Sequence, residues 1–150
     1  MSFTPYVPGL TPRPPDGAYD AFKEVSVPLA DCRAWREGLR FYREGAFWEA
    51  HEVWEAVWMA APEKSAEKLM VQGVIQLANA RLKRRIGRDA AAERLEGMAR
   101  DLMREAWARA GGVVMGLAPG DGAARLAARP LCHRVSPGRA DRRVQILHPF

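Results

Sequence analysis

The chain has 150 residues, of which 48% are hydrophobic and 27% are charged, and it carries a formal net charge of +5. A chain of this length forms one domain and buries roughly 70% of the surface that its unfolded form would expose. Two cysteines, Cys32 and Cys132, are too few and too far apart for a disulfide framework or a zinc-binding cysteine cluster. No apolar run is long enough to span a membrane, and the first residues do not resemble a signal peptide. We therefore expect a cytoplasmic protein with no membrane partner.

Proline dominates the N-terminal end of the chain. Six of the 11 prolines lie within the first 28 residues, and proline both fixes φ and removes a backbone donor, which disfavours a helix. Aromatic residues in the same segment argue against full disorder. We expect residues 1–30 to form a proline-rich arm that lies across a helical body.

Residues 31–110 predict that helical body. Capping residues, helical spacing of apolar side chains, and glycine or proline stops predict four helices packed as a compact antiparallel array, an all-α fold. The first begins after Asp31 as its N-cap and ends at Gly45, and the others cover about 47–60, 63–86 and 89–110. In the fourth helix, the spacing predicts an inward face of Leu95, Met98, Leu102, Ala106 and Ala110. The predicted core contains Trp54, Trp58, Val71, Ile75 and Leu102.

The C-terminal end carries the positive charge. Six of the 23 basic residues, but only one of the 18 acidic residues, lie within 122–150. No aromatic residues are interleaved with these arginines, so we expect at most weak, salt-dependent attraction to polyanions and no specific nucleic-acid partner. Residues 111–150 are interpreted as an irregular basic tail in which only 144–147 resembles a strand.

The helix over 47–60 combines an apolar stripe with titratable side chains. A period of 3.6 residues places His51 inside the stripe and Glu55 one turn later, within its reach. Glu52 is expected to be more exposed, and Glu49 is expected to point away from the stripe towards solvent. Trp48 lies at the margin of the stripe, where its ring could form the wall of a pocket.

The third predicted helix carries a polar row, formed by Gln72, Gln76, Asn79 and Lys83. Apolar residues flank this row on both sides, so at least the first two amides are expected to be buried and to need hydrogen-bond partners. The nearest candidates are His51 and Glu55. The candidate polar site therefore consists of Trp48, His51, Glu52, Glu55, Gln72, Gln76 and Asn79.

Three interpretations of this cluster stay open. His51 can be a core histidine whose hydrogen bonds fix the register of two helices, or the cluster can line a pocket for a small polar ligand. Both fit a non-catalytic binding or interaction module, with a small polar ligand or a protein as partner and no cofactor. The alternative is a metal-assisted hydrolase that uses a divalent metal at His51-Glu52-x-x-Glu55, although the second histidine of the zinc-protease motif is missing. The sequence assigns no catalytic residue and does not decide whether the protein is an enzyme.

Two stretches, FYREGAFWEAHEVWE at 41–55 and QGVIQLA at 72–78, resemble the signature of the domain of unknown function 309 family. The resemblance covers about residues 31–110, and the arm around 7–13 is similar to the arms of some members. It implies a compact all-helical protein from bacteria or archaea. It implies no established activity, substrate or cofactor.

Overall fold

The computed structural model describes residues 3–120 and residue 126, and within them the fold is all-α, as predicted. The elements are the short 3-10 helices η1 (Asp20–Phe22) and η2 (Leu29–Asp31), followed by α1 (Arg33–Arg43), α2 (Phe47–Ala60), α3 (Ala66–Arg85) and α4 (Asp89–Ala110). The described residues contain no strand, only an isolated bridge between Val114 and Leu117. The predicted strand at 144–147 and the arginines of 122–150 lie outside the described residues.

The helix boundaries agree with the sequence for α2 and α4 and differ for α1 and α3. α3 begins at Ala66 instead of residue 63, because Ser65 Oγ accepts a hydrogen bond of 3.1 Å from the backbone N–H of Lys68 and so acts as the N-cap. α1 begins at Arg33, because Asp31 belongs to η2 and Cys32 takes the N-cap position. Gly45 follows α1 with φ of 81°, a conformation that glycine adopts without strain.

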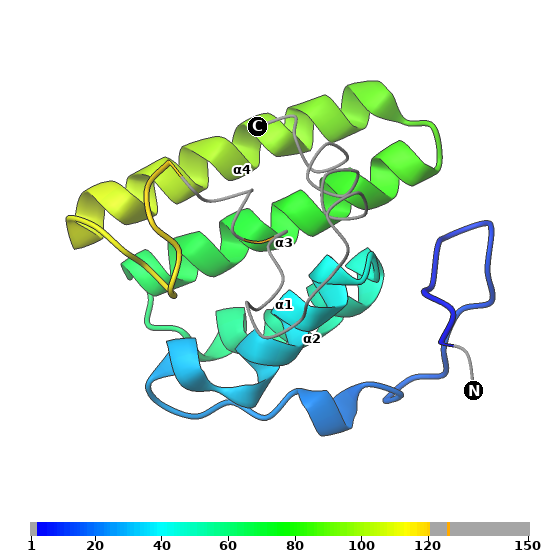
Figure 1. Ribbon diagram of the computed structural model, residues 1–150, viewed down its shortest axis with the longest axis horizontal. Coiled ribbons are helices and arrows are strands. Elements are labelled where there is room, and N and C mark those ends of the chain that lie inside the picture. Colours follow the sequence, from blue (N-terminus) through cyan, green and yellow to red (C-terminus); the bar gives the residue numbers. More distant parts are fainter. Residues whose placement is uncertain (1–2, 121–125, 127–150) are drawn as a thin grey trace, which may run out of the picture.

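Consecutive helices pack against one another, and α3 and α4 make the most extensive contact. Figure 1 shows α3 and α4 side by side, with α1 and α2 on one side of this pair. The proline-rich arm runs along the outer side of α1 and α2 (Figure 1). The arm therefore contacts the first helical pair rather than the second.

Glycine allows two of the helix pairs to approach closely. A Cβ added to Gly38 in α1 would lie 2.6 Å or less from atoms of the Trp54 ring in α2, and one added to Gly73 in α3 would lie 2.7 Å from Met103 Cγ in α4. Trp54 is fully buried, and its Nε1 donates a hydrogen bond of 3.3 Å to the carbonyl of Trp35. Because Gly38 and Gly73 have no side chain, they leave room for the main hydrophobic contacts between these helices.

The predicted core is correct for Trp54, Val71 and Ile75 and wrong for Trp58. The Trp58 side chain is 36% exposed, and Lys68 Nζ lies 4.2 Å from the centre of its ring. Leu102 is half-buried. Trp58 lies close to the C-terminal end of α2, where the lysine of α3 covers its ring and the core does not enclose it.

The inward face of α4 also differs from the prediction. Ala106 is buried as predicted, but Met98 is 45% exposed and Ala110 is exposed. The other residues turned to the core are Ala92, Glu96, Ala99 and Met103. Small alanines face α3 because they permit the close approach at Gly73. Glu96 is only 3% exposed and pairs with Arg84 of α3 through two hydrogen bonds of 2.7 and 3.0 Å. Periodicity based on large apolar side chains does not detect a face of this kind.

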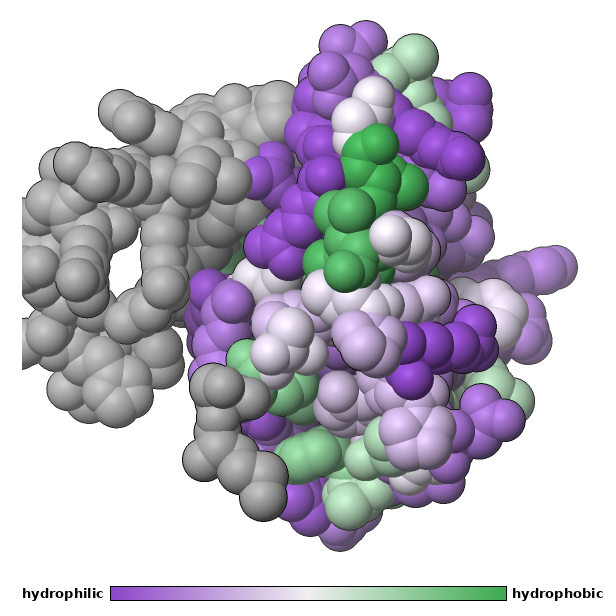
Figure 2. Space-filling model, turned by 90° about the vertical axis from the view of Figure 1, so that its right-hand side faces the viewer, coloured by the Kyte–Doolittle hydropathy of each residue, from purple (hydrophilic) through white to green (hydrophobic). Residues whose placement is uncertain are grey.

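The outer surface is largely hydrophilic on the side viewed in Figure 2. Hydrophobic residues form one compact strip there, with smaller areas lower on the same face, and hydrophilic residues surround them (Figure 2). Across residues 3–120, no helix combines the length and the apolar character that crossing a membrane requires.

Candidate functional site

Aromatic rings hold the proline-rich arm against α1 and α2. Tyr6 packs edge-on against Trp48 with ring centres 5.0 Å apart, and Tyr19 packs against both Trp48 at 6.0 Å and Phe41 at 5.7 Å. Phe22 adds a further edge-on contact with Phe41 at 5.5 Å. Edge-to-face pairs at these distances are favourable beyond the area they bury. The arm thus has a defined place on the helical body.

Glu49 lies under the arm and is fully buried, which contradicts its predicted exposure. Its Oε2 accepts a hydrogen bond of 2.9 Å from the backbone N–H of Tyr6 and one of 3.4 Å from the hydroxyl of Tyr19. Its Oε1 is also buried, and no described residue donates a hydrogen bond to it. The prediction was wrong because helical periodicity considers only the helix itself, whereas the arm covers this side of α2.

Burial is the main cause of an elevated pKa for the Glu49 carboxyl. The hydrogen bonds from Tyr6 and Tyr19 and the positive charge of Arg85 oppose this effect, but the pKa remains raised above its usual 4.5. The same environment raises the pKa of Tyr19 to about 12, first through burial and then through the charge of Glu49 and the hydrogen bond to it. Tyr19 therefore stays protonated at neutral pH and remains a donor to Glu49.

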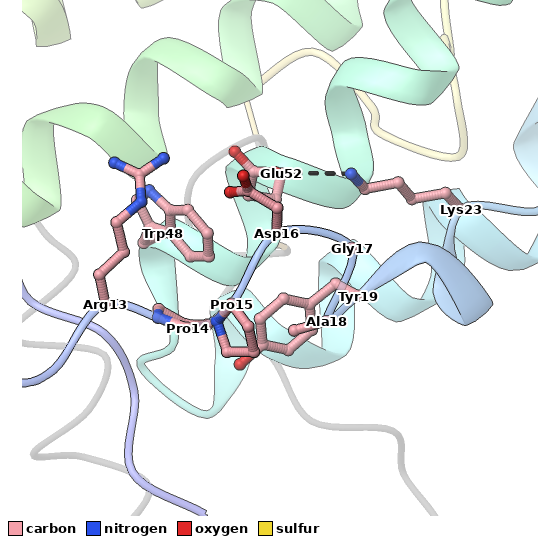
Figure 3. Close-up of a pocket in the computed structure, with 10 residues that line it drawn as sticks. All are labelled: Arg13, Pro14, Pro15, Asp16, Gly17, Ala18, Tyr19, Lys23, Trp48 and Glu52. Atoms are coloured by element: carbon pink, nitrogen blue, oxygen red, sulfur yellow. Dashed lines mark hydrogen bonds and ion pairs between the residues drawn. The ribbon is translucent and has the colours of Figure 1, made fainter.

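A small cavity lies between the arm and α2, and Figure 3 shows its walls. We call it the arm–α2 cavity, and its lining is Arg13, Pro14, Pro15, Asp16, Gly17, Ala18, Tyr19, Lys23, Trp48 and Glu52. Its volume is about 80 Å³. The rings of Trp48 and Tyr19 supply apolar surface, and four charged side chains supply polar groups. Cavities with mixed linings of this kind are typical of ligand sites, although most are larger.

The charges around the cavity are only partly paired. Lys23 Nζ lies 3.4 Å from Glu52 Oε2 and 3.4 Å from Asp20 Oδ1. Within residues 3–120, Arg13 and Asp16 have no ion-pair partner, and both are exposed. The cavity therefore presents one cation and one carboxylate that are available to a ligand.

His51 is half-buried, with its side chain 20% exposed. Its Nε2 lies 2.9 Å from Glu55 Oε1, which matches the contact predicted from their spacing of four residues. Its Nδ1 lies 3.9 Å from Glu52 Oε1 and is buried, with no hydrogen-bond partner among the described side chains and backbone groups. The Glu52 side chain, at 26% exposed, is only slightly more accessible than His51. Glu55 is the exposed member of the group.

The polar row of α3 forms no hydrogen bond with His51 in residues 3–120. Gln72, Gln76 and Asn79 are half-buried, and no hydrogen bond in the described part of the chain joins them to His51. The contacts of α3 with its neighbours come from other faces, which include the fully buried Val71. The row lies on the less buried side of α3, where water can satisfy amides, so they do not need His51.

Residues 3–120 do not contain a complete set of metal ligands. No group of three or more His, Cys, Asp or Glu side chains is arranged there to hold a metal ion. His51, Glu52 and Glu55 are neighbours on α2, but they do not form such a group. His133 and His148, the other histidines, lie outside the described residues.

Sequence reasoning found Trp48 and Glu52 and missed the arm residues that complete the cavity. The missed lining residues are Arg13, Asp16, Tyr19 and Lys23, and Tyr6 and Glu49, which join the arm to α2, were missed as well. Aromatic residues within a proline-rich segment signalled that the arm docks. No pattern in the sequence indicated the side of α2 that it covers.

These elements define a small all-helical protein in which an N-terminal arm docks on the first helical pair and encloses a polar cavity. The family model of the domain of unknown function DUF309 matches residues 35–95, from α1 into α4, so this part of the chain is similar to that family. The resemblance seen in the sequence is confirmed. No curated protein and no solved structure gives a match to the chain.

Proposed function

We propose that the protein is a non-catalytic binding module whose ligand site is the arm–α2 cavity. The observation that carries this proposal is the convergence of two aromatic rings, two carboxylates and two cations on one small space between segments that are distant in sequence. A few placed polar groups beside an apolar wall give orientation and specificity to a ligand site.

The size of the cavity limits the part of the ligand that enters it. A volume of about 80 Å³ compares with roughly 30 Å³ for each molecule of liquid water. A head group of a few non-hydrogen atoms fits, and the rest of the ligand would lie in solvent. The Trp48 ring offers a face to the apolar or cationic part of that head group.

The charges of the cavity favour a head group that carries both signs. Lys23 is already neutralised by Glu52 and Asp20, so Arg13 and Asp16 supply the available charges. The ammonium and carboxylate groups of an amino acid would pair with both, whereas a singly charged ligand would pair with only one. We therefore assign the ligand to the class of zwitterions with an amino-acid head group.

A metal-assisted hydrolase at His51-Glu52-x-x-Glu55 is the second interpretation. The contact between His51 and Glu55 does not distinguish it from the binding module, since a histidine paired with a carboxylate occurs in either class. No observation in residues 3–120 favours it specifically, and catalytic residues remain unassigned.

Glycine is the simplest probe of the proposed site, and the indole N–H resonance of Trp48 is the readout. In ¹⁵N-labelled protein, we expect glycine to shift this resonance saturably, with a Kd on the order of 1 mM, as suits a small exposed site. Acetate and methylammonium at equal ionic strength should bind at least about tenfold more weakly, because each leaves one charge of the cavity unpaired. Trp48→Phe assigns the resonance.

The variant Asp16→Asn should weaken glycine binding by about fivefold or more, since it removes the carboxylate that pairs with the ammonium group. Asp101→Asn, which changes an exposed carboxylate on α4, is the matched control and should leave binding unchanged. Equal responses to glycine and acetate would contradict the assignment of a zwitterionic ligand. No response to glycine would contradict the proposal that the arm–α2 cavity is a binding site.

A further inference from the structure

We propose that Glu49 is the positioning residue of the arm–α2 cavity, because its buried carboxylate fixes both ends of the loop that forms the cavity wall. The consequence for ligand binding rests on the function proposed above. The role of Glu49 in docking the arm does not depend on that function, and it is measured by a separate experiment.

Glu49 accepts hydrogen bonds from both sides of this loop, next to Trp48, whose ring both sides also contact. The cavity loop, residues 13–18, lies between Tyr6 and Tyr19 in the sequence, and both of these residues donate to the same oxygen, Oε2. Tyr19 follows the loop directly. One acceptor on α2 therefore sets the position of the segment on either side of the loop.

The Tyr6 end of the loop is itself braced. Thr11 Oγ1 accepts a hydrogen bond of 2.7 Å from the N–H of Val7 and donates one of 3.1 Å to the carbonyl of Pro5. The N–H groups of Leu10 and Thr11 both donate to the carbonyl of Val7, at 2.9 and 3.0 Å. Because this turn is rigid, fixing the N–H of Tyr6 also fixes the chain that enters the cavity loop.

Docking of the arm carries a free-energy cost because Glu49 is only half-satisfied. Oε2 accepts two hydrogen bonds, whereas Oε1 is buried without a partner in residues 3–120. Burying an acceptor that has no donor costs free energy, and this cost offsets part of the gain from the aromatic contacts. Release of the arm would return the whole carboxylate to water. The exchange between docked and released states therefore favours docking by less than the contacts of the arm alone would give.

The charges around Glu49 determine how pH affects this exchange. The titratable and charged groups that act on its carboxyl are Tyr19 from the arm and Arg85 from α3, and Tyr6 contributes only its backbone N–H. Burial raises the pKa of Glu49 in the docked state, so the docked state binds more protons than the released state. Docking is therefore favoured at low pH and weakens as the pH rises through the pKa of Glu49.

Hydrogen exchange of the Tyr6 amide in the full-length protein measures docking directly. We expect exchange to be at least about tenfold faster in Glu49→Ala than in the wild type, because the acceptor is lost. Glu49→Gln keeps an acceptor oxygen and should restore exchange to within about threefold of the wild type. Glu55→Ala, on the exposed side of the same helix, is the matched control and should match the wild type. Amides of α4 report whether each variant is folded.

The chemical shift of the Tyr6 amide proton gives a second readout that a purely structural role would not move. In the wild type it should titrate with a midpoint above 4.5, and in Glu49→Gln this titration should vanish although the protein remains folded. A wild-type midpoint at or below 4.5, or unchanged Tyr6 exchange in Glu49→Ala, would overturn the positioning role. Equal acceleration at Tyr6 and throughout α4 would overturn it too, because the loss would then be global.

Glycine binding separates this role from the proposed function. We expect Glu49→Ala to bind glycine at least about sixfold more weakly than the wild type, because the cavity wall moves with the arm. Glu49→Gln should restore the affinity. If glycine binds to none of the proteins while Tyr6 exchange responds as expected, the proposed function fails and the positioning of the arm by Glu49 stands. If glycine binds equally to all of them, the link between Glu49 and the site fails.

Discussion

Trp54 and Trp58 lie one turn apart on α2, yet their surroundings differ. Trp54 is fully buried between α1 and α2, where it contacts the rings of Trp35 and Tyr42 at 5.6 and 5.9 Å. Trp58 is 36% exposed and its ring is covered by Lys68. At the level of single residues, the stability of the fold therefore depends on the first tryptophan far more than on the second.

We predict that Trp54→Ala lowers the free energy of unfolding by about 3–5 kcal/mol, because it removes buried surface and leaves a cavity. Trp58→Ala should cost no more than about 1 kcal/mol, since it removes a partly exposed ring and one cation–π contact. Urea unfolding followed by circular dichroism measures both. Similar losses in the two variants would show that Trp58 contributes to the core after all.

Glu49 gives a second prediction at this scale, for stability as a function of pH. The pKa of its carboxyl is higher in the folded protein than in the unfolded chain, so the folded state binds more protons. Through Glu49, the wild type should lose stability as the pH rises above 4.5 and through the raised pKa of this carboxyl, whereas Glu49→Gln cannot titrate. The variant should therefore gain stability relative to the wild type across this window. Urea unfolding at several pH values tests this, and a gain that is constant or shrinks would contradict it.

Helix pairs in this protein depend on glycines as much as on large side chains. Gly38 allows α1 to contact the Trp54 ring, and Gly73 allows α3 to approach Met103 of α4. Gly97, in the middle of α4, has open space where a Cβ would lie. The same residue type therefore has opposite effects on stability at different positions within a helix.

Gly38→Ala should lower the free energy of unfolding by about 1–3 kcal/mol, because the added methyl group meets a rigid, buried indole ring. This loss exceeds the gain in helix propensity, which by itself would favour alanine by about 1 kcal/mol. Gly97→Ala is the matched control and should raise stability by up to about 1 kcal/mol. Thermal melts of both variants would reveal the two signs, and stabilisation by Gly38→Ala would contradict the close contact.

For the molecule as a whole, local sequence signals predicted the helices and most of the buried faces of α2 and α3, but not the buried face of α4. The bounds of α2 and α4 followed from proline and glycine stops, because these residues act on the backbone wherever the chain packs. The inward face of α4 did not follow, since Ala92, Ala99 and the paired Glu96 carry little hydrophobic signal. Packing against Gly73 selects these side chains, and packing is a property of two helices rather than one.

The site could be predicted only in part for the same reason. Trp48 and Glu52 were found because they share a helix with His51, and the contact between His51 and Glu55 follows from helical geometry alone. Glu49, Tyr6 and Tyr19 meet across 43 and 30 residues of sequence. A single sequence contains no signal for contacts at such separations. The half-buried Gln72 and Gln76 were predicted as partners because apolar residues flank them and because their helix follows α2 after a short connection.

The contact between Gly38 and Trp54 also constrains the order in which the sequence can change. The two residues occupy one shared volume, so a larger side chain at 38 requires a smaller one at 54. Their substitutions should be strongly non-additive, with the double change less harmful than the sum of its parts. A mutational path through this pair passes first through the cavity left by a reduced Trp54, or first through the clash at Gly38. In either order, the first variant remains folded only if the free energy of unfolding of the wild type exceeds the loss caused by the first substitution.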